Sequence, residues 1–176
     1  MKRREVYYTY DLANTFQAMI SGGVLLASTK RSGRSNVMTI GWGTVGIIWG
    51  KPAFIVMVRP SRYTYEFIEE SGAFTVNVPT PEMRSLASFC GTKSGRDVDK
   101  FAALGMAVSP GQRVQSITID ACPLVYECRV VHKNDVIPAN LDAEVASRAY
   151  PRGDYHRVYY GEILGVFAHE ETATEG

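Results

Sequence analysis

The chain has 176 residues and a mass of 19.4 kDa, a size typical of one domain, and we expect residues 1–176 to form a single domain. Nineteen Lys and Arg against eighteen Asp and Glu leave a formal net charge of +1, which argues against nucleic acid or a membrane as partner. Three cysteines are too few for a disulfide framework, and neither they nor the three histidines have metal-site spacing, so we expect a cytoplasmic protein without a metal.

Short strands predominate along the chain, and the predicted helices are few. Apolar side chains at helical spacing predict the helices, and runs of β-branched and aromatic residues predict the strands. Gly72 and Gly91 are expected to end two helices, and Thr80 with Pro81 to begin one. In chain order the predicted elements are a helix at 11–20, strands at 24–28, 36–45 and 53–58, a helix at 63–70, a strand at 74–78, helices at 81–90 and 99–104, and strands at 117–119, 124–132 and 157–167.

This order does not alternate each strand with a full-length helix, which disfavours a doubly wound parallel sheet. No repeat period is visible, and no linker rich in Pro or Ser divides the chain. We therefore expect a mainly β fold, a closed antiparallel β-barrel with peripheral helices.

Residues 59–64, Arg-Pro-Ser-Arg-Tyr-Thr, join a predicted buried strand to the start of a helix. Free N–H groups and the positive end of the helix dipole attract an anion there, and Ser61, Arg62 and Thr64 add side-chain donors. A capped surface helix with solvated arginines is the alternative. This segment alone does not decide between the two.

Two other segments are similarly ambiguous. Residues 91–100 gather glycines, hydroxyls and cations, which fits either an anion-binding loop or an exposed turn. Four glycines interrupt the strand-like residues 36–50, which fits either a flat ligand lying against the backbone or corners of a barrel. If the first of these segments shares a pocket with residues 59–64, then Arg62 and Lys100 together neutralise a phosphate.

In this order the three segments resemble the flavin reductase-like family of FMN-binding split barrels, particularly its flavoredoxin-like members. The resemblance runs from about Phe16 to Phe167. It is carried by NVMTIGW at 36–42, Pro52, RPSRYT at 59–64, FTVNVP at 74–79, Ser94-Gly95 and DKF at 99–101. It implies an antiparallel split barrel of Greek-key type, a homodimer, and non-covalently bound FMN.

The resemblance also implies where the cofactor lies. The flavin ring is expected beside residues 38–42, and the phosphate on Ser61, Arg62, Thr64 and Lys100. The complete predicted set of cofactor-binding residues is Asn36, Met38, Thr39, Ile40, Trp42, Arg59, Ser61, Arg62, Tyr63, Thr64, Ser94, Gly95 and Lys100.

The catalytic residues remain unknown from the sequence. Many relatives carry Gly-Asp-His with a Gly five residues after the His, and here His156 and Gly161 match while Tyr155 is inserted before the His. His156 is thus a candidate neighbour of nicotinamide or flavin, and a solvent-facing or otherwise satisfied histidine is the alternative. Cys90 fits a structural residue better than a redox-active one.

The resemblance predicts a flavoprotein oxidoreductase that moves electrons from NADH or NADPH through FMN to a small molecule or a redox protein. The alternative is a flavoredoxin-type FMN electron carrier that does not react with nicotinamide. A cofactor-free barrel that binds nucleic acid or protein conflicts with the near-neutral charge and with the lack of a basic stripe carrying aromatics.

Overall fold

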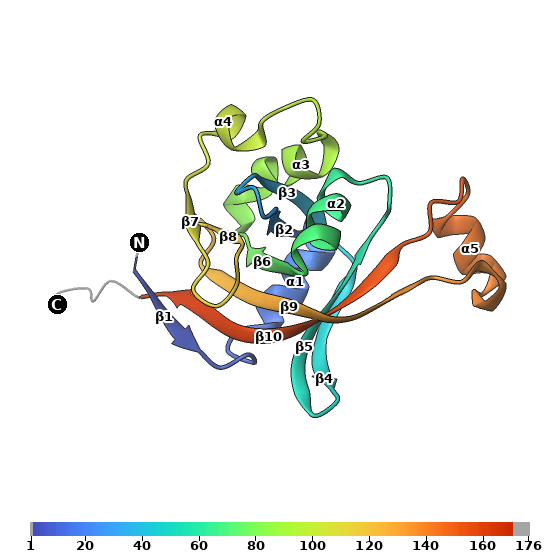
Figure 1. Ribbon diagram of the computed structural model, residues 1–176, viewed down its shortest axis with the longest axis horizontal. Helices are drawn as coiled ribbons and strands as arrows, with labels where there is room; N and C mark the ends of the chain where they lie inside the picture. Colours follow the sequence, from blue (N-terminus) through green and yellow to red (C-terminus); the bar gives the residue numbers. More distant parts are fainter. Residues whose placement is uncertain (1, 171–176) are drawn as a thin grey trace.

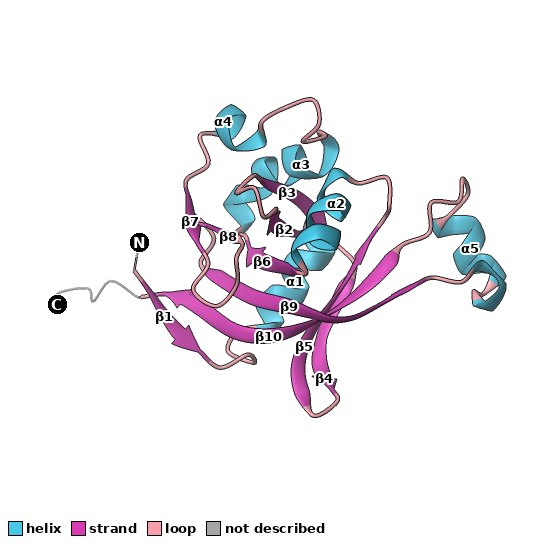
Figure 2. Ribbon diagram, in the orientation of Figure 1, coloured by secondary structure: helices cyan, strands magenta, loops and turns pink. Residues whose placement is uncertain are grey.

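The computed structural model describes residues 2–170 and shows one large antiparallel sheet with helices around it (Figures 1 and 2). The sheet path runs β3-β2-β6-β9-β10-β5-β4, with β1 paired to β10, and β7 and β8 form a separate pair. The strands are β1 (Arg3–Val6), β2 (Val24–Thr29), β3 (Ser35–Ile40), β4 (Gly43–Ile48), β5 (Lys51–Val58), β6 (Ala73–Val78), β7 (Val108–Pro110), β8 (Ile117–Ile119), β9 (Leu124–Asp135) and β10 (Arg157–His169). The helices are α1 (Leu12–Ser21), α2 (Tyr63–Ser71), η1 (Pro81–Met83), α3 (Arg84–Thr92), α4 (Lys100–Leu104), η2 (Pro138–Asn140) and α5 (Ala143–Ala149).

The expected mainly β architecture with peripheral helices is confirmed. The path begins at β3 and ends at β4, and the chain connects these two strands directly through Gly41 and Trp42. Among residues 2–170 no ladder pairs β3 with β4, so the barrel is open at this point rather than closed. Aromatic and aliphatic side chains such as Phe54, Phe74 and Tyr126 fill its interior and are fully buried.

Several element boundaries differ from those predicted. The strand expected at 36–45 is two strands, because the chain turns at Gly41 and Trp42. Gly91 does not end its helix, since α3 continues to Thr92. A Cβ atom at Gly91 would lie 3.3 Å from Cβ of Thr39, so this glycine allows α3 to pack closely on β3.

Strands β9 and β10 extend beyond the barrel and carry a protruding segment between them (Figure 1). We call residues 136–156 the arm; it contains η2 and α5, neither of which the sequence analysis predicted. Asp142 caps α5 by accepting hydrogen bonds from the amides of Glu144 and Val145. The arm returns to the barrel at His156, directly before β10.

Candidate functional site

A groove of about 220 Å³ lies where β3 ends and the chain turns into β4. It combines backbone from this turn with side chains from β5, from the segment before α2 and from the end of the arm. We call it the β3 groove, and its lining residues are Met38, Thr39, Ile40, Gly41, Trp42, Met57, Arg59, Arg62 and His156. Trp42 is 45% exposed, so a large aromatic face remains available to a ligand.

A second cavity, of about 420 Å³, lies between the start of α2 and the loop after α3. We call it the loop pocket. Its lining residues are Asn36, Met38, Ser61, Arg62, Tyr63, Thr64, Cys90, Gly91, Thr92, Lys93, Ser94, Gly95, Arg96, Asp97 and Lys100. Met38 and Arg62 line both cavities, so the β3 groove and the loop pocket adjoin along these two residues.

Lys100 supplies a buried cation to the loop pocket. Asp99 caps α4 by accepting hydrogen bonds from two backbone amides, which fixes Lys100 as the first residue of the helix. Only 3% of Lys100 is exposed, and its Nζ donates to the carbonyls of Val37 at 2.8 Å and Cys90 at 2.7 Å. Burial lowers the pKa of Lys100, and Arg62 acts in the same direction. Among the described residues no carboxylate lies within ion-pair distance of this ammonium.

The start of α2 adds backbone and hydroxyl donors to the loop pocket. Arg62 occupies the N-cap position of α2. In the described chain no side chain caps this helix, so no capping side chain accepts a hydrogen bond from its first N–H groups. Thr64 is buried, and its hydroxyl oxygen accepts a hydrogen bond from Asn36 Nδ2 at 2.8 Å. The Thr64 proton therefore remains available to an acceptor.

Arg59 and Ser61 line the cavities, but their side chains also bind the arm. Arg59 donates to the carbonyls of Ala149 at 2.8 Å and Asp154 at 3.1 Å, and Ser61 donates to the Asp154 carboxylate at 2.6 Å. Asp154 has φ 58°, a left-handed conformation that is uncommon outside glycine. These contacts tie the arm to the segment between β5 and α2.

All thirteen predicted cofactor-binding residues line the β3 groove or the loop pocket, and His156 lines the β3 groove. The predicted set of cofactor-binding residues omits Met57 of the groove, and it omits Gly41, Arg96 and Asp97, which lie inside the predicted segments 38–42 and 91–100. Met57 was accessible to prediction, because it precedes Arg59 by two residues and strand side chains alternate between faces. The contact between Asp154 and Ser61 had no local signal, since 93 residues separate them.

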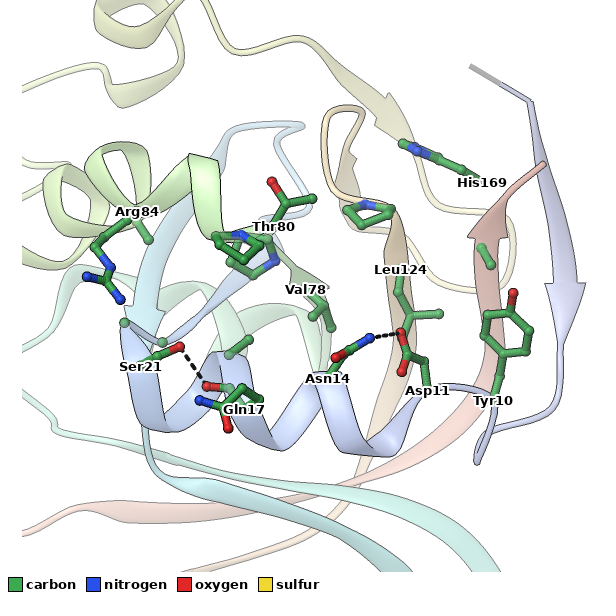
Figure 3. A pocket seen from close by; sticks show the side chains of 18 of the residues that line it. Tyr10, Asp11, Asn14, Gln17, Ser21, Val78, Thr80, Arg84, Leu124 and His169 are labelled. Carbon is green, nitrogen blue, oxygen red and sulfur yellow. Dashed lines mark hydrogen bonds between the residues drawn. The ribbon is translucent and has the colours of Figure 1, made fainter. Parts of the chain in front are cut away.

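Another cavity, of about 430 Å³, lies beside α1 and is lined by none of the predicted cofactor-binding residues (Figure 3). Its polar groups partly satisfy one another, since Asn14 donates to Asp11 and the Ser21 hydroxyl donates to the Gln17 carbonyl. Arg84 is the single Lys or Arg among its lining residues, and the carboxylates of Asp11 and Glu170 outnumber it. An anionic ligand therefore fits the loop pocket better.

Within residues 2–170 no group of three or more His, Cys, Asp and Glu side chains is arranged to hold a metal. Within the same range no helix is long and apolar enough to cross a membrane. Cys90 is buried, and burial raises the pKa of its thiol, which disfavours the reactive thiolate.

A sequence profile of the flavin reductase like domain matches residues 17–175. An uncharacterized protein of Archaeoglobus fulgidus is 32% identical over 133 residues, which cover 76% of this chain and 65% of the relative. The uncharacterized protein YddH of Escherichia coli K12 is 30% identical over 155 residues, covering 87% of this chain and 73% of the relative. The chain thus spans about two thirds to three quarters of the length of these relatives.

Three solved structures are similar in fold. Flavoredoxin of Desulfovibrio vulgaris (Miyazaki F) superposes with a TM-score of 0.68 at 27% identity, covering 84% of this chain and 69% of that one. Flavoredoxin from Methanosarcina acetivorans superposes with a TM-score of 0.67 at 29% identity, covering 88% of this chain and 72% of that one. An FMN-binding domain of a flavin reductases-like enzyme from Shewanella baltica superposes with a TM-score of 0.66 at 21% identity, covering 95% of this chain and 77% of that one. At this identity the similarity supports the fold alone. Because the profile match extends over nearly the whole chain, this protein belongs to the flavin reductase-like family of split-barrel proteins.

Proposed function

We propose that the chain binds FMN without a covalent bond and acts as an NAD(P)H-dependent FMN oxidoreductase. The observation that carries this proposal is the buried Lys100 ammonium, which lines the loop pocket without a carboxylate partner in the described chain. A buried charge without a counter-ion is costly unless a ligand supplies one. A phosphate group bound in the loop pocket supplies that charge.

The two cavities fit the two ends of FMN. At the phosphate end, Lys100 has one N–H beyond the two that its carbonyl partners use, Arg62 adds an exposed guanidinium, and Thr64 adds a hydroxyl proton. At the other end, the β3 groove offers backbone of residues 38–42 and the exposed face of Trp42 to a flat ring. Met38 and Arg62 line both cavities, so they would contact the ribityl chain between the two ends.

When bound, FMN supplies the hydride and single-electron chemistry. The side chains in the β3 groove then position the ring and control its access to water and to a second substrate, and no nucleophile or acid–base pair is required of them. The electron acceptor in this proposal is a small molecule or a redox protein. The similarity to two flavoredoxins favours a second candidate function, an FMN electron carrier that does not react with nicotinamide.

The purified chain should take up FMN in equal molar amount and show the absorbance spectrum of a bound flavin. Anaerobic mixing with NADH or NADPH should then bleach that absorbance, because a reductase accepts hydride from one of the two. Riboflavin, which lacks the phosphate, is the matched ligand and should bind more weakly. Bleaching by a reduced ferredoxin-like donor, with both nicotinamides inert, would select the electron carrier, and failure to bind FMN would contradict both functions.

We also infer a homodimer, which the family resemblance implies. The β4–β5 hairpin and the arm carry apolar side chains that the single chain leaves exposed, including Ile47 at 55%, Trp49 at 66% and Ile137 at 55%. Light scattering should give a molar mass near twice 19.4 kDa. A mass equal to one chain at the concentrations used for FMN titration would contradict the dimer.

A further inference from the structure

His156 is held at the edge of the β3 groove by the arm. It is 8% exposed, its ring lies 5.0 Å from the Trp42 ring between centroids, and its Nδ1 is 2.8 Å from the Tyr150 hydroxyl oxygen. Tyr150 follows the last residue of α5 and is itself buried. One nitrogen of the imidazole therefore has a buried partner within the protein.

The other imidazole nitrogen faces open space. Across residues 2–170, Arg3 Nε is the single buried side-chain nitrogen or oxygen that lacks a hydrogen-bond partner. His156 Nε2 also has no hydrogen bond with the described residues. Because it is not among the buried atoms without a partner, it must be exposed to solvent. His156 lines the β3 groove and none of the other cavities described above, so the groove is the cavity that its side chain borders.

Two features place the proton on Nε2. Burial, with a smaller contribution from Arg59, lowers the pKa of His156 to about 4, so the imidazole is uncharged at neutral pH and carries one proton. Burial raises the pKa of the Tyr150 hydroxyl, which stays protonated at neutral pH. A phenol is a stronger hydrogen-bond donor than acceptor, so across the 2.8 Å contact the Tyr150 hydroxyl donates its proton to Nδ1.

The position of Tyr150 is itself fixed. The Arg59 guanidinium lies 5.0 Å from the centroid of the Tyr150 ring and donates to the carbonyl of Ala149. On the other side, Tyr155 stacks on Tyr150 with centroids 4.6 Å apart and an interplanar angle of 27°. Tyr155 is the residue by which this chain departs from the Gly-Asp-His pattern, and here it packs against the residue that contacts His156.

We infer that Tyr150 is a positioning residue that fixes His156 as the Nε2–H tautomer, so that the β3 groove presents an uncharged hydrogen-bond donor. Such a donor recognises a carbonyl oxygen or an unprotonated ring nitrogen of a flat heteroaromatic ligand. It does so without adding positive charge beside Arg59 and Arg62. The role toward a bound ring rests on the proposed FMN function, while the tautomer is a property of the chain itself.

Tyr150→Phe tests this assignment, with Tyr155→Phe as the matched control because no hydrogen bond involves the Tyr155 hydroxyl among the described residues. Two-bond proton–nitrogen NMR correlations of the purified full-length chain distinguish the tautomers of His156. The parent and Tyr155→Phe should show Nε2–H alone, and Tyr150→Phe should show a mixture of both tautomers. The midpoint potential of bound FMN should shift in Tyr150→Phe in the same direction as in His156→Phe, and should not shift in Tyr155→Phe.

A parent chain in the Nδ1–H tautomer, or a Tyr150→Phe variant that keeps Nε2–H alone, would overturn the assignment. An unchanged potential in Tyr150→Phe beside a shifted one in His156→Phe would overturn the role toward the ring. The NMR measurement requires no flavin, so a chain that failed to bind FMN would refute the proposed function while the tautomer result still decided the role of Tyr150.

Discussion

Lys100→Met should weaken FMN binding by roughly ten- to a hundredfold. A hydrogen bond to a charged group contributes about 1.5–3 kcal/mol, and about 1.4 kcal/mol corresponds to a tenfold change in affinity. Methionine keeps an unbranched chain of similar length, so the main change is the loss of the buried ammonium. Fluorescence quenching of FMN during titration measures the effect, and riboflavin affinity should change little because riboflavin has no phosphate.

A second variant guards against misfolding. Lys100→Met also removes the donor to the Val37 and Cys90 carbonyls, which destabilises the buried site. Arg62 is exposed and makes no side-chain hydrogen bond within the described residues, so Arg62→Ala should fold normally and still weaken FMN binding. Arg31→Ala is the control, because this exposed arginine lines neither the β3 groove nor the loop pocket. Parental FMN affinity in both test variants would exclude the loop pocket as the phosphate site.

The same titration has a pH dependence of defined sign. Burial depresses the pKa of Lys100 in the free chain below its usual 10.5, and a bound phosphate favours the charged ammonium and raises that pKa. FMN affinity should therefore fall as the pH rises through the free-chain pKa of Lys100. Over the same pH range the free energy of unfolding of the FMN-free chain should rise with pH, because the unfolded state holds this proton more tightly. Lys100→Met should lose both dependences.

Most residues that line the two cavities lie in three continuous segments with local signals, which made them predictable from sequence, whereas Met57 and His156 lie outside those segments. Asp99 caps α4 and Gly72 ends α2 in the left-handed conformation, so these local boundaries followed from residue type. The arm was not predictable in this way. Helix α5 has seven residues, and its position depends on contacts from Arg59 and Ser61 that span about ninety residues of sequence. Tertiary contacts of this kind leave no periodic pattern.

Glycine was the least reliable local signal, because it serves both to end elements and to permit close packing. Gly72 ends a helix and has φ 66°, whereas Gly91 lies inside α3 against Thr39. Gly95 likewise leaves no space for a side chain, since a Cβ atom there would collide with the Asn36 amide beside the loop pocket. Composition alone does not distinguish these uses, which depend on what lies opposite each glycine in the folded chain.

Gly161, the family glycine five residues after His156, belongs to the close-packing class. A Cβ atom at this position would collide with Phe74 Cζ and lie 2.9 Å from Cys128 Cβ, both in fully buried side chains. Gly161 also lies at an irregularity in the register between β10 and β9, which brings its backbone close to these side chains. Gly161 therefore leaves space for the core side chains of Phe74 and Cys128 beneath β10. It lines neither the β3 groove nor the loop pocket.

Gly161→Ala should accordingly lower the free energy of unfolding by about 1–3 kcal/mol through overpacking, measured by urea denaturation at a fixed protein concentration. Gly46→Ala is the control: a Cβ atom there meets no heavy atom within 4 Å, and φ of Gly46 is not positive. That variant should be neutral or gain up to about 1 kcal/mol, because alanine restricts the unfolded chain. Equal stability of the two variants would mean that Phe74 and Cys128 move aside without cost. If Gly161→Ala kept the parental stability but bound FMN poorly, this glycine would belong to the cofactor site instead.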